Sequence, residues 1–149
     1  MKILLDDATC HVARYAPPGS PARHDIVLVH GAANDHSAWH DVAPLLASRG
    51  VTVHVPDLPG HGQSTGKPLD SVEALADWLL ALVAALGLEA PIFAGHSMGS
   101  LIALAAAAKA GQGAGGLALL GSAVPMPVSE ALLDSARKTP DAACRMVAL

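Results

Sequence analysis

Gly95-His96-Ser97-Met98-Gly99 is the most informative segment of the sequence. A short apolar run, Pro91-Ile92-Phe93-Ala94, precedes it, and an alanine-rich run over 101–110 follows. The pentapeptide fits Gly-x-Ser-x-Gly, in which a strained strand-to-helix turn raises the serine above a sheet. Glycines two residues to either side let the strand and the helix approach closely. We predict such a turn, with Ser97 as nucleophile. The competing interpretation is an ordinary turn whose serine caps the helix.

The segments around this turn alternate between strand and helix patterns. Continuous apolar runs, which suit strands buried on both faces, alternate with stretches that place apolar residues at helical spacing. Strands are expected at 26–29, 51–55, 91–94 and 117–120, after a hairpin of 3–5 and 10–15, and helices at 38–49, 71–86, 101–110 and 129–138. This order predicts an α/β fold with a mainly parallel sheet and helices on both faces.

Two of the expected helices carry recognisable start signals. Ser37 is expected to cap a helix that buries Trp39, Val42, Ala43 and Leu46 and closes at Gly50. The pair Asp70 and Glu73 has the spacing of a capping box for the helix that ends at Gly87.

A second loop carries features of an anion-binding site. His30-Gly31-Ala32-Ala33 follows the strand at 26–29. Acyl transfer requires two N–H donors aimed at the developing oxyanion, and after such an elbow they come from the residue following the nucleophile and from a loop of this kind. The N–H groups of Met98 and Ala32 are the candidates. On residue types alone, a simple tight turn explains the loop equally well.

Four motifs in register resemble the α/β-hydrolase superfamily, in the branch of small esterases, lactonases, cofactor-free haloperoxidases and carbon–carbon bond hydrolases. They are Leu28-Val29-His30-Gly31, Trp39, the segment 57–64 (Asp-Leu-Pro-Gly-His-Gly-Gln-Ser) and Gly95-His96-Ser97-Met98-Gly99. The resemblance implies a strand order of 1-2-4-3-5-6-7-8, a serine nucleophile at Ser97, and support of the site by Gly95, His96, Gly99, His30 and Gly31. It also implies that 1–122 is the N-terminal part of the core domain and 123–149 the start of a helical cap.

The chain departs from the family's pattern after Ser97. In that family the residues of the catalytic triad follow one another along the chain in the order serine, acid, histidine. None of the eight histidines follows Ser97, and Glu130, Asp134 and Asp141 are the only acids that do. We therefore expect a fragment, ending after about the sixth strand, of a hydrolase that cleaves an ester, lactone or related acyl bond. The alternative is a non-catalytic remnant that binds a small apolar ligand or a partner chain.

The remaining histidines offer neither a convincing base nor a convincing metal site. His96 neighbours Ser97, His30 adjoins the oxyanion loop and His61 lies in the loop after Asp57, where a structural role is expected. His36 and His40 have a spacing that can hold zinc, but no third ligand is evident, so two solvated histidines are expected. We predict no cofactor and no metal.

Composition sets the remaining expectations. The chain has 149 residues, of which 52% are hydrophobic and 15% charged, and its net charge is -4 with the two signs mixed. This favours one globular domain with a small-molecule substrate and no nucleic-acid or membrane partner. Cys10 and Cys144 show no metal-ligand spacing, and the apolar stretch after Met1 is too short for a signal peptide. A cytoplasmic protein is expected, with self-association through the bare edge at 117–120.

Overall fold

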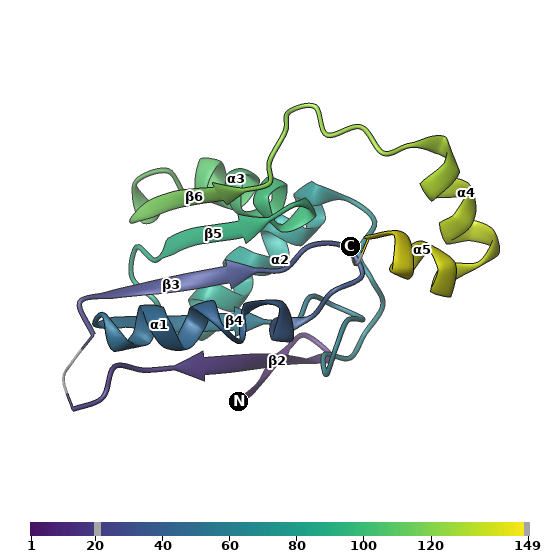
Figure 1. Ribbon diagram of the computed structural model, residues 1–149. Coiled ribbons are helices and arrows are strands. Elements are labelled where there is room, and N and C mark those ends of the chain that lie inside the picture. Colours follow the sequence, from purple (N-terminus) through teal and green to yellow (C-terminus); the bar gives the residue numbers. More distant parts are fainter. Residues whose placement is uncertain (20–21, 148–149) are drawn as a thin grey trace.

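Six strands form one sheet in the computed structural model, which describes residues 1–19 and 22–147 (Figure 1). Their order across the sheet is β1-β2-β4-β3-β5-β6. The strands are β1 (Lys2–Leu5), β2 (Ala8–Tyr15), β3 (His24–Val29), β4 (Val51–Pro56), β5 (Ile92–His96) and β6 (Gly116–Leu120). The pairs β3–β4, β3–β5 and β5–β6 are parallel. The pairs β1–β2 and β2–β4 are antiparallel. The mainly parallel sheet and its strand order confirm the sequence-based prediction.

The apolar run at the centre of the sheet is explained by burial on both faces. Val27 and Val29 pack into the core beneath α2 (Val72–Ala85) and α3 (Met98–Ala110). Ile26 and Leu28 pack into a second core beneath α1 (Val42–Ser48). Because successive side chains of a strand point to opposite faces, both sets must be apolar. Figure 1 shows α1 on one face and α2 and α3 on the other, as expected.

The predicted helix at 38–49 is interrupted. A 3-10 helix, η1 (His36–Trp39), precedes α1. Asp35, not Ser37, caps it, by accepting a hydrogen bond from the Ser37 N–H at 2.8 Å. Pro44 explains the break, because a proline ring collides with the carbonyl four residues earlier in a continuous helix. The break turns Val42 outward, where it is 42% exposed, so its predicted burial was wrong.

The long helix α2 forms as predicted, with its cap one residue later. The Ser71 hydroxyl accepts a hydrogen bond from the Ala74 N–H at 3.2 Å, so Ser71 takes the place expected of Asp70. The predicted apolar face is buried in its middle part, at Leu75, Ala76, Leu79, Leu82 and Val83. Gly87 adopts a φ of +66° directly after the helix, a conformation that favours glycine.

Two short helices follow the sheet. α4 (Glu130–Lys138) and α5 (Pro140–Val147) lie beyond the carboxyl ends of the parallel strands, after an extended connection from β6 (Figure 1). β6 is an edge strand with exposed leucines at 117, 119 and 120. Cys10 is buried and Cys144 exposed, and neither is in a disulfide. Among the described residues, no helix has the length and apolarity needed to cross a membrane.

Candidate active site

Ser97 occupies a sharp turn between β5, which ends at His96, and α3, which begins at Met98. Its backbone has φ 54° and ψ -123°. A positive φ in a residue with a side chain is uncommon and costs on the order of 1–3 kcal/mol, so such residues persist only where the surrounding structure enforces them. Ser97 therefore sits on the strained strand-to-helix turn that the sequence predicts.

Backbone hydrogen bonds fix this strained residue on both sides. The Ser97 N–H donates to the carbonyl oxygen of Leu120 at the end of β6, at 2.9 Å. Its own carbonyl accepts from the Ser100 N–H at 2.8 Å and from the Ser100 hydroxyl at 2.6 Å. The Ser97 side chain makes no capping hydrogen bond to α3. The competing interpretation, a serine that serves as a helix cap, is therefore wrong.

Glycines allow three segments to meet at Ser97. A Cβ on Gly95 would collide with the carbonyl oxygen of Gly99, and one on Gly99 would collide with the carbonyl oxygens of Val29 and His30. These contacts bring the start of α3 against the ends of both β5 and β3. A Cβ on Gly31 would lie 3.3 Å from the Cβ of Ser97, so the loop after β3 runs directly beside the serine.

The two expected oxyanion donors, the N–H groups of Ala32 and Met98, belong to the residues that directly follow Gly31 and Ser97 in the sequence. Met98 is the first residue of α3, where backbone N–H groups lack intrahelical acceptors and favour negative charge. Ala32 directly follows Gly31 and is half-buried. Within residues 1–19 and 22–147, neither N–H donates a hydrogen bond. Both N–H groups are therefore free to donate to a ligand, which oxyanion stabilisation would require.

His30 is fully buried, and both of its ring nitrogens are engaged. Nδ1 lies 2.9 Å from the carbonyl oxygen of Gly31, and Nε2 accepts the Leu58 N–H at 3.1 Å. This pattern requires the neutral ring with its proton on Nδ1. Burial is the main cause that lowers the pKa of His30. His30 thus joins the loop beside Ser97 to the loop after β4.

His61 and His96 contact groups other than the Ser97 hydroxyl. His61 lies beside His30, with ring centroids 5.4 Å apart, and its Nδ1 is 3.0 Å from the carbonyl oxygen of Pro59. His96 is exposed and rests against Gly31 and Gly121. In the part of the chain that the structure describes, the Ser97 hydroxyl has no hydrogen-bond partner. Within residues 1–19 and 22–147, no histidine forms a hydrogen bond with this hydroxyl.

A pocket of about 340 Å³ adjoins the turn. It is lined by Asn34, Ala38, Trp39, Val42, His96, Leu120 and Val147. These residues come from the loop after β3, from η1 and α1, from the ends of β5 and β6, and from α5. The indole nitrogen of Trp39 is buried without a hydrogen-bond partner among the described residues. A mostly apolar recess beside a nucleophile is suited to the carbon chain of a small substrate.

The loop after β4 is anchored by Asp57, which is completely buried. Its carboxylate accepts hydrogen bonds from the Gln63 N–H at 2.8 Å and from the His36 N–H at 2.6 Å. The expected structural role of this loop is thus consistent with its geometry. His36 Nδ1 lies 2.8 Å from Asp57 Oδ1, and the His36 side chain is only 22% exposed, so the prediction that His36 is a solvated histidine was wrong. His40 is 71% exposed, as expected.

Comparison with known proteins identifies relatives over most of the chain. A family model described as "alpha/beta hydrolase fold" matches residues 26–148. The lipase LipV of Mycobacterium tuberculosis is 32% identical over 133 residues, which cover 88% of this chain and 49% of that protein. Pimeloyl-[acyl-carrier protein] methyl ester esterase of Aeromonas hydrophila is 44% identical over 80 residues, which cover 53% of this chain and 30% of that protein.

Solved structures give the same result. A thermophilic esterase from Thermogutta terrifontis superposes with a TM-score of 0.75 at 26% identity, covering 95% of this chain and 52% of that one. Est816, described as an N-acyl homoserine lactone degrading enzyme, superposes with a TM-score of 0.77 at 23% identity, covering 96% of this chain and 54% of that one, and supports the fold alone. The chain spans between about a third and a half of the length of the curated relatives named above.

Proposed function

The chain belongs to the α/β-hydrolase fold family, and from this membership we propose that it carries the nucleophile half of a serine hydrolase acting on an ester, lactone or related acyl bond. Relatives that share its sequence include an esterase, a lipase and a succinate-derivative hydrolase. Hydrolysis is therefore the family-level activity. The finer proposal rests on one observation, the strained φ of 54° at Ser97 between β5 and α3.

In the proposed chemistry the Ser97 hydroxyl attacks the carbonyl carbon of the substrate. The negative charge that develops on the carbonyl oxygen is held by the N–H groups of Ala32 and Met98. The bond to the leaving alcohol breaks, the alcohol takes up the proton, and an acyl group remains on Ser97. Water then attacks this acyl group, the bond to the Ser97 oxygen breaks, a carboxylic acid leaves and a proton of the water returns to the serine oxygen.

The step that this chain lacks is removal of the serine proton. A serine hydroxyl is a weak nucleophile until a base accepts its proton, and none of the histidines follows Ser97 in the sequence. His30, the upstream histidine closest in sequence to the oxyanion loop, has both ring nitrogens committed elsewhere. We propose that the triad acid and histidine lie outside this chain and that residues 123–149 begin a cap over the site.

A test of this proposal compares hydrolysis of a nitrophenyl ester by the chain and by Ser97→Ala. Loss of the histidine alone costs roughly 10⁶ in turnover, while an intact oxyanion hole leaves about 10³–10⁴ over water. We expect a small rate that Ser97→Ala changes little, because without its base the serine adds little to the rate that the oxyanion hole supplies. A rate typical of a complete enzyme would contradict the missing base.

A second function, binding without turnover, is favoured by the same missing base together with the pocket beside His96 and Trp39. The recess remains suited to a small apolar ligand when no acyl transfer takes place. Equilibrium binding of a short-chain fatty ester to Ser97→Ala separates this function from catalysis. Tight binding with no Ser97-dependent hydrolysis in the unmodified chain would favour the binding function.

A further inference from the structure

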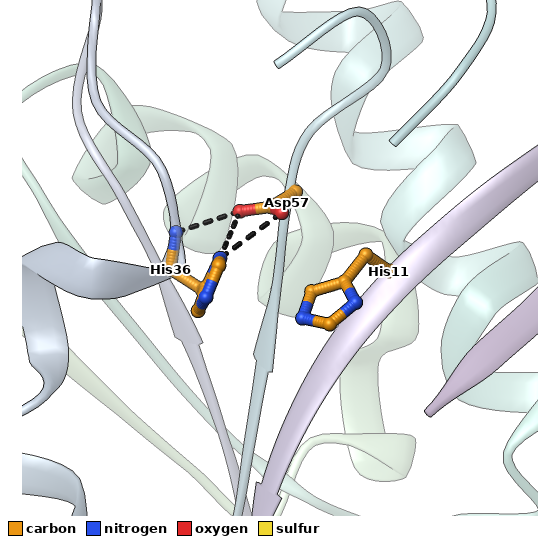
Figure 2. A group of neighbouring side chains, drawn as sticks. All are labelled: His11, His36 and Asp57. Atoms are coloured by element: carbon orange, nitrogen blue, oxygen red, sulfur yellow. Dashed lines mark hydrogen bonds and ion pairs between the residues drawn. The ribbon is translucent and has the colours of Figure 1, made fainter. Parts of the chain in front are cut away.

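Three side chains from distant parts of the sequence converge behind the loop that Asp57 anchors. They are His11 on β2, His36 at the start of η1 and Asp57 directly after β4 (Figure 2). One nitrogen or oxygen atom from each lies within 4.8 Å of the corresponding atoms of the other two. No sequence motif links the three residues, because they come together only through the folding of the sheet.

The sheet itself sets two of the three positions. β2 and β4 pair antiparallel, with Val12 opposite Pro56. The pairing continues by one residue, because the Asp57 N–H donates to the His11 carbonyl oxygen at 2.9 Å. His11 and Asp57 are therefore held side by side by the regular ladder, which gives the arrangement the rigidity that ligand sites require.

The carboxylate of Asp57 is fixed before any ligand arrives. It is completely buried and accepts the backbone N–H groups of His36 and Gln63. Gly62, with a φ of +52°, packs so closely that a Cβ there would lie 2.5 Å from the carboxyl carbon of Asp57. A buried carboxylate is costly unless its charge is compensated, and a cation beside it compensates that charge.

The two imidazole rings complete a set of nitrogen and oxygen ligands. His36 Nδ1 lies 2.8 and 3.0 Å from the two carboxylate oxygens of Asp57. The centroid of the His11 ring is 4.7 Å from that of His36, and both side chains are half-buried, so solvent and ions can reach them. Figure 2 shows both rings on the same side of the Asp57 carboxylate.

We propose that His11, His36 and Asp57 bind a divalent transition-metal ion, with zinc the best match. Zinc is commonly held by two histidines and one carboxylate, with water as a fourth ligand. The ion would take the place of the proton on His36 Nδ1, and the neutral ring would carry its proton on Nε2 instead. Ligand atoms in a tetrahedral zinc site lie roughly 3.4 Å apart, so rotation of the half-buried His11 ring closes the remaining gap.

This site has a structural consequence for the rest of the molecule. His36 follows the loop that contains Gly31 and Ala32, while His11 and Asp57 belong to the sheet. A metal ion bound by all three would fasten that loop to β2 and β4. Because an ion that binds the folded chain and not the unfolded one stabilises the folded state, zinc should raise the melting temperature.

The experiment measures zinc binding by the metal-free chain, using calorimetry for stoichiometry and cobalt substitution for the absorption bands of a tetrahedral site. The informative variant is His11→Phe, which keeps a ring against His36 and removes the ligating nitrogen. The matched control is His40→Phe, because His40 is an exposed histidine on the same segment. His36→Gln, whose amide can still donate to Asp57, serves if His11→Phe fails to fold.

We expect the unmodified chain and His40→Phe to bind a single zinc ion equally well. His11→Phe should lose at least about tenfold in affinity, together with the zinc-dependent rise in melting temperature. Equal affinity in His11→Phe and the unmodified chain would overturn the proposal, as would binding that depends on His40. Absence of zinc binding would leave the cluster as a plain hydrogen bond between His36 and Asp57 and would also overturn it.

Discussion

At the scale of single residues, the turn at Ser97 depends on glycines that no other residue can replace without cost. A Cβ on Gly99 would press into the carbonyl oxygens of Val29 and His30, which belong to the sheet and its following loop. Backbone atoms cannot move aside as the end of a flexible side chain can. The pattern Gly-x-Ser-x-Gly predicted the turn because an apolar strand precedes it and an alanine-rich helix follows it, whereas its contacts with Val29 and His30 could not be read from the pattern.

Gly99→Ala should consequently lower the free energy of unfolding by about 1–3 kcal/mol, the usual cost of overpacking. Urea denaturation measures this change. The matched control is Gly113→Ala, since a Cβ there would meet only the Cβ of Ala110 at 3.8 Å. If both variants were equally stable, the tight approach of α3 to β3 would be wrong.

A second residue-scale prediction concerns pH and His30. Burial lowers the pKa of His30 from its ordinary value of 6.5, so the unfolded chain binds a proton at a higher pH than the folded chain does. Stability that depends on neutral His30 is therefore present above pH 6.5 and is lost as the pH falls through the window below it. Protonation of Nε2 would also remove the acceptor for the Leu58 N–H.

The measurement is the free energy of unfolding between neutral and mildly acidic pH, for the unmodified chain and His30→Gln. The variant should show a shallower loss of stability on acidification, because glutamine does not titrate. His11, whose pKa is also lowered by burial, contributes a loss of the same sign in both proteins. An identical pH dependence in the two proteins would show that His30 is not the titrating group.

At the scale of elements, helix and strand identities were predictable and their ends were less so. Asp70 and Ser71 are adjacent, and either side chain can cap a helix, so composition alone could not choose between them. The break between η1 and α1 follows from Pro44, whose ring prevents the preceding turn from joining α1 as one helix. Local propensities therefore fix which elements form, whereas caps are decided by single side-chain contacts.

The cap of α2 gives an element-scale prediction. Ser71→Ala removes the acceptor for the Ala74 N–H and should cost about 1 kcal/mol of stability. Asp70→Ala, one residue earlier, should change stability by less than about 0.5 kcal/mol because it removes no cap. Thermal or urea denaturation of the two variants shows which of the two residues caps α2. A larger cost for Asp70→Ala would place the cap at the residue first predicted.

The edge strand β6 gives the other element-scale prediction. Leu117, Leu119 and Leu120 are each more than 40% exposed on a strand at the edge of the sheet. An apolar edge offers unpaired backbone groups to another chain. We predict self-association at micromolar concentration, measured by light scattering, and its reduction by the double change Leu117→Lys and Leu119→Lys. Leu45→Lys, at an exposed leucine on α1, should leave it unchanged.

A monodisperse monomer with a cooperative melt would contradict this prediction. So would equal association of the Leu45→Lys protein and the double variant, since the association would then not depend on the edge.

At the scale of the whole molecule, contacts between distant segments were beyond reach from the sequence. His36 and His40 were both expected to be solvated; His40 is exposed, but His36 lies beside His11 and Asp57. That grouping depends on the register of β2 against β4, which no local pattern specifies. Similarly, the approach of Gly31 to Ser97 depends on the sheet order, which was expected from resemblance to a family.

The central claim is that Ser97 is a nucleophile supported by an oxyanion site but lacking its base. The most direct test is labelling of the chain by a fluorophosphonate, with the adduct mapped by mass spectrometry, beside Ser97→Ala and the exposed-serine control Ser37→Ala. We predict a slow reaction, with the adduct on Ser97, unchanged in Ser37→Ala and absent in Ser97→Ala. Labelling at another residue, or equal labelling of Ser97→Ala, would contradict the claim.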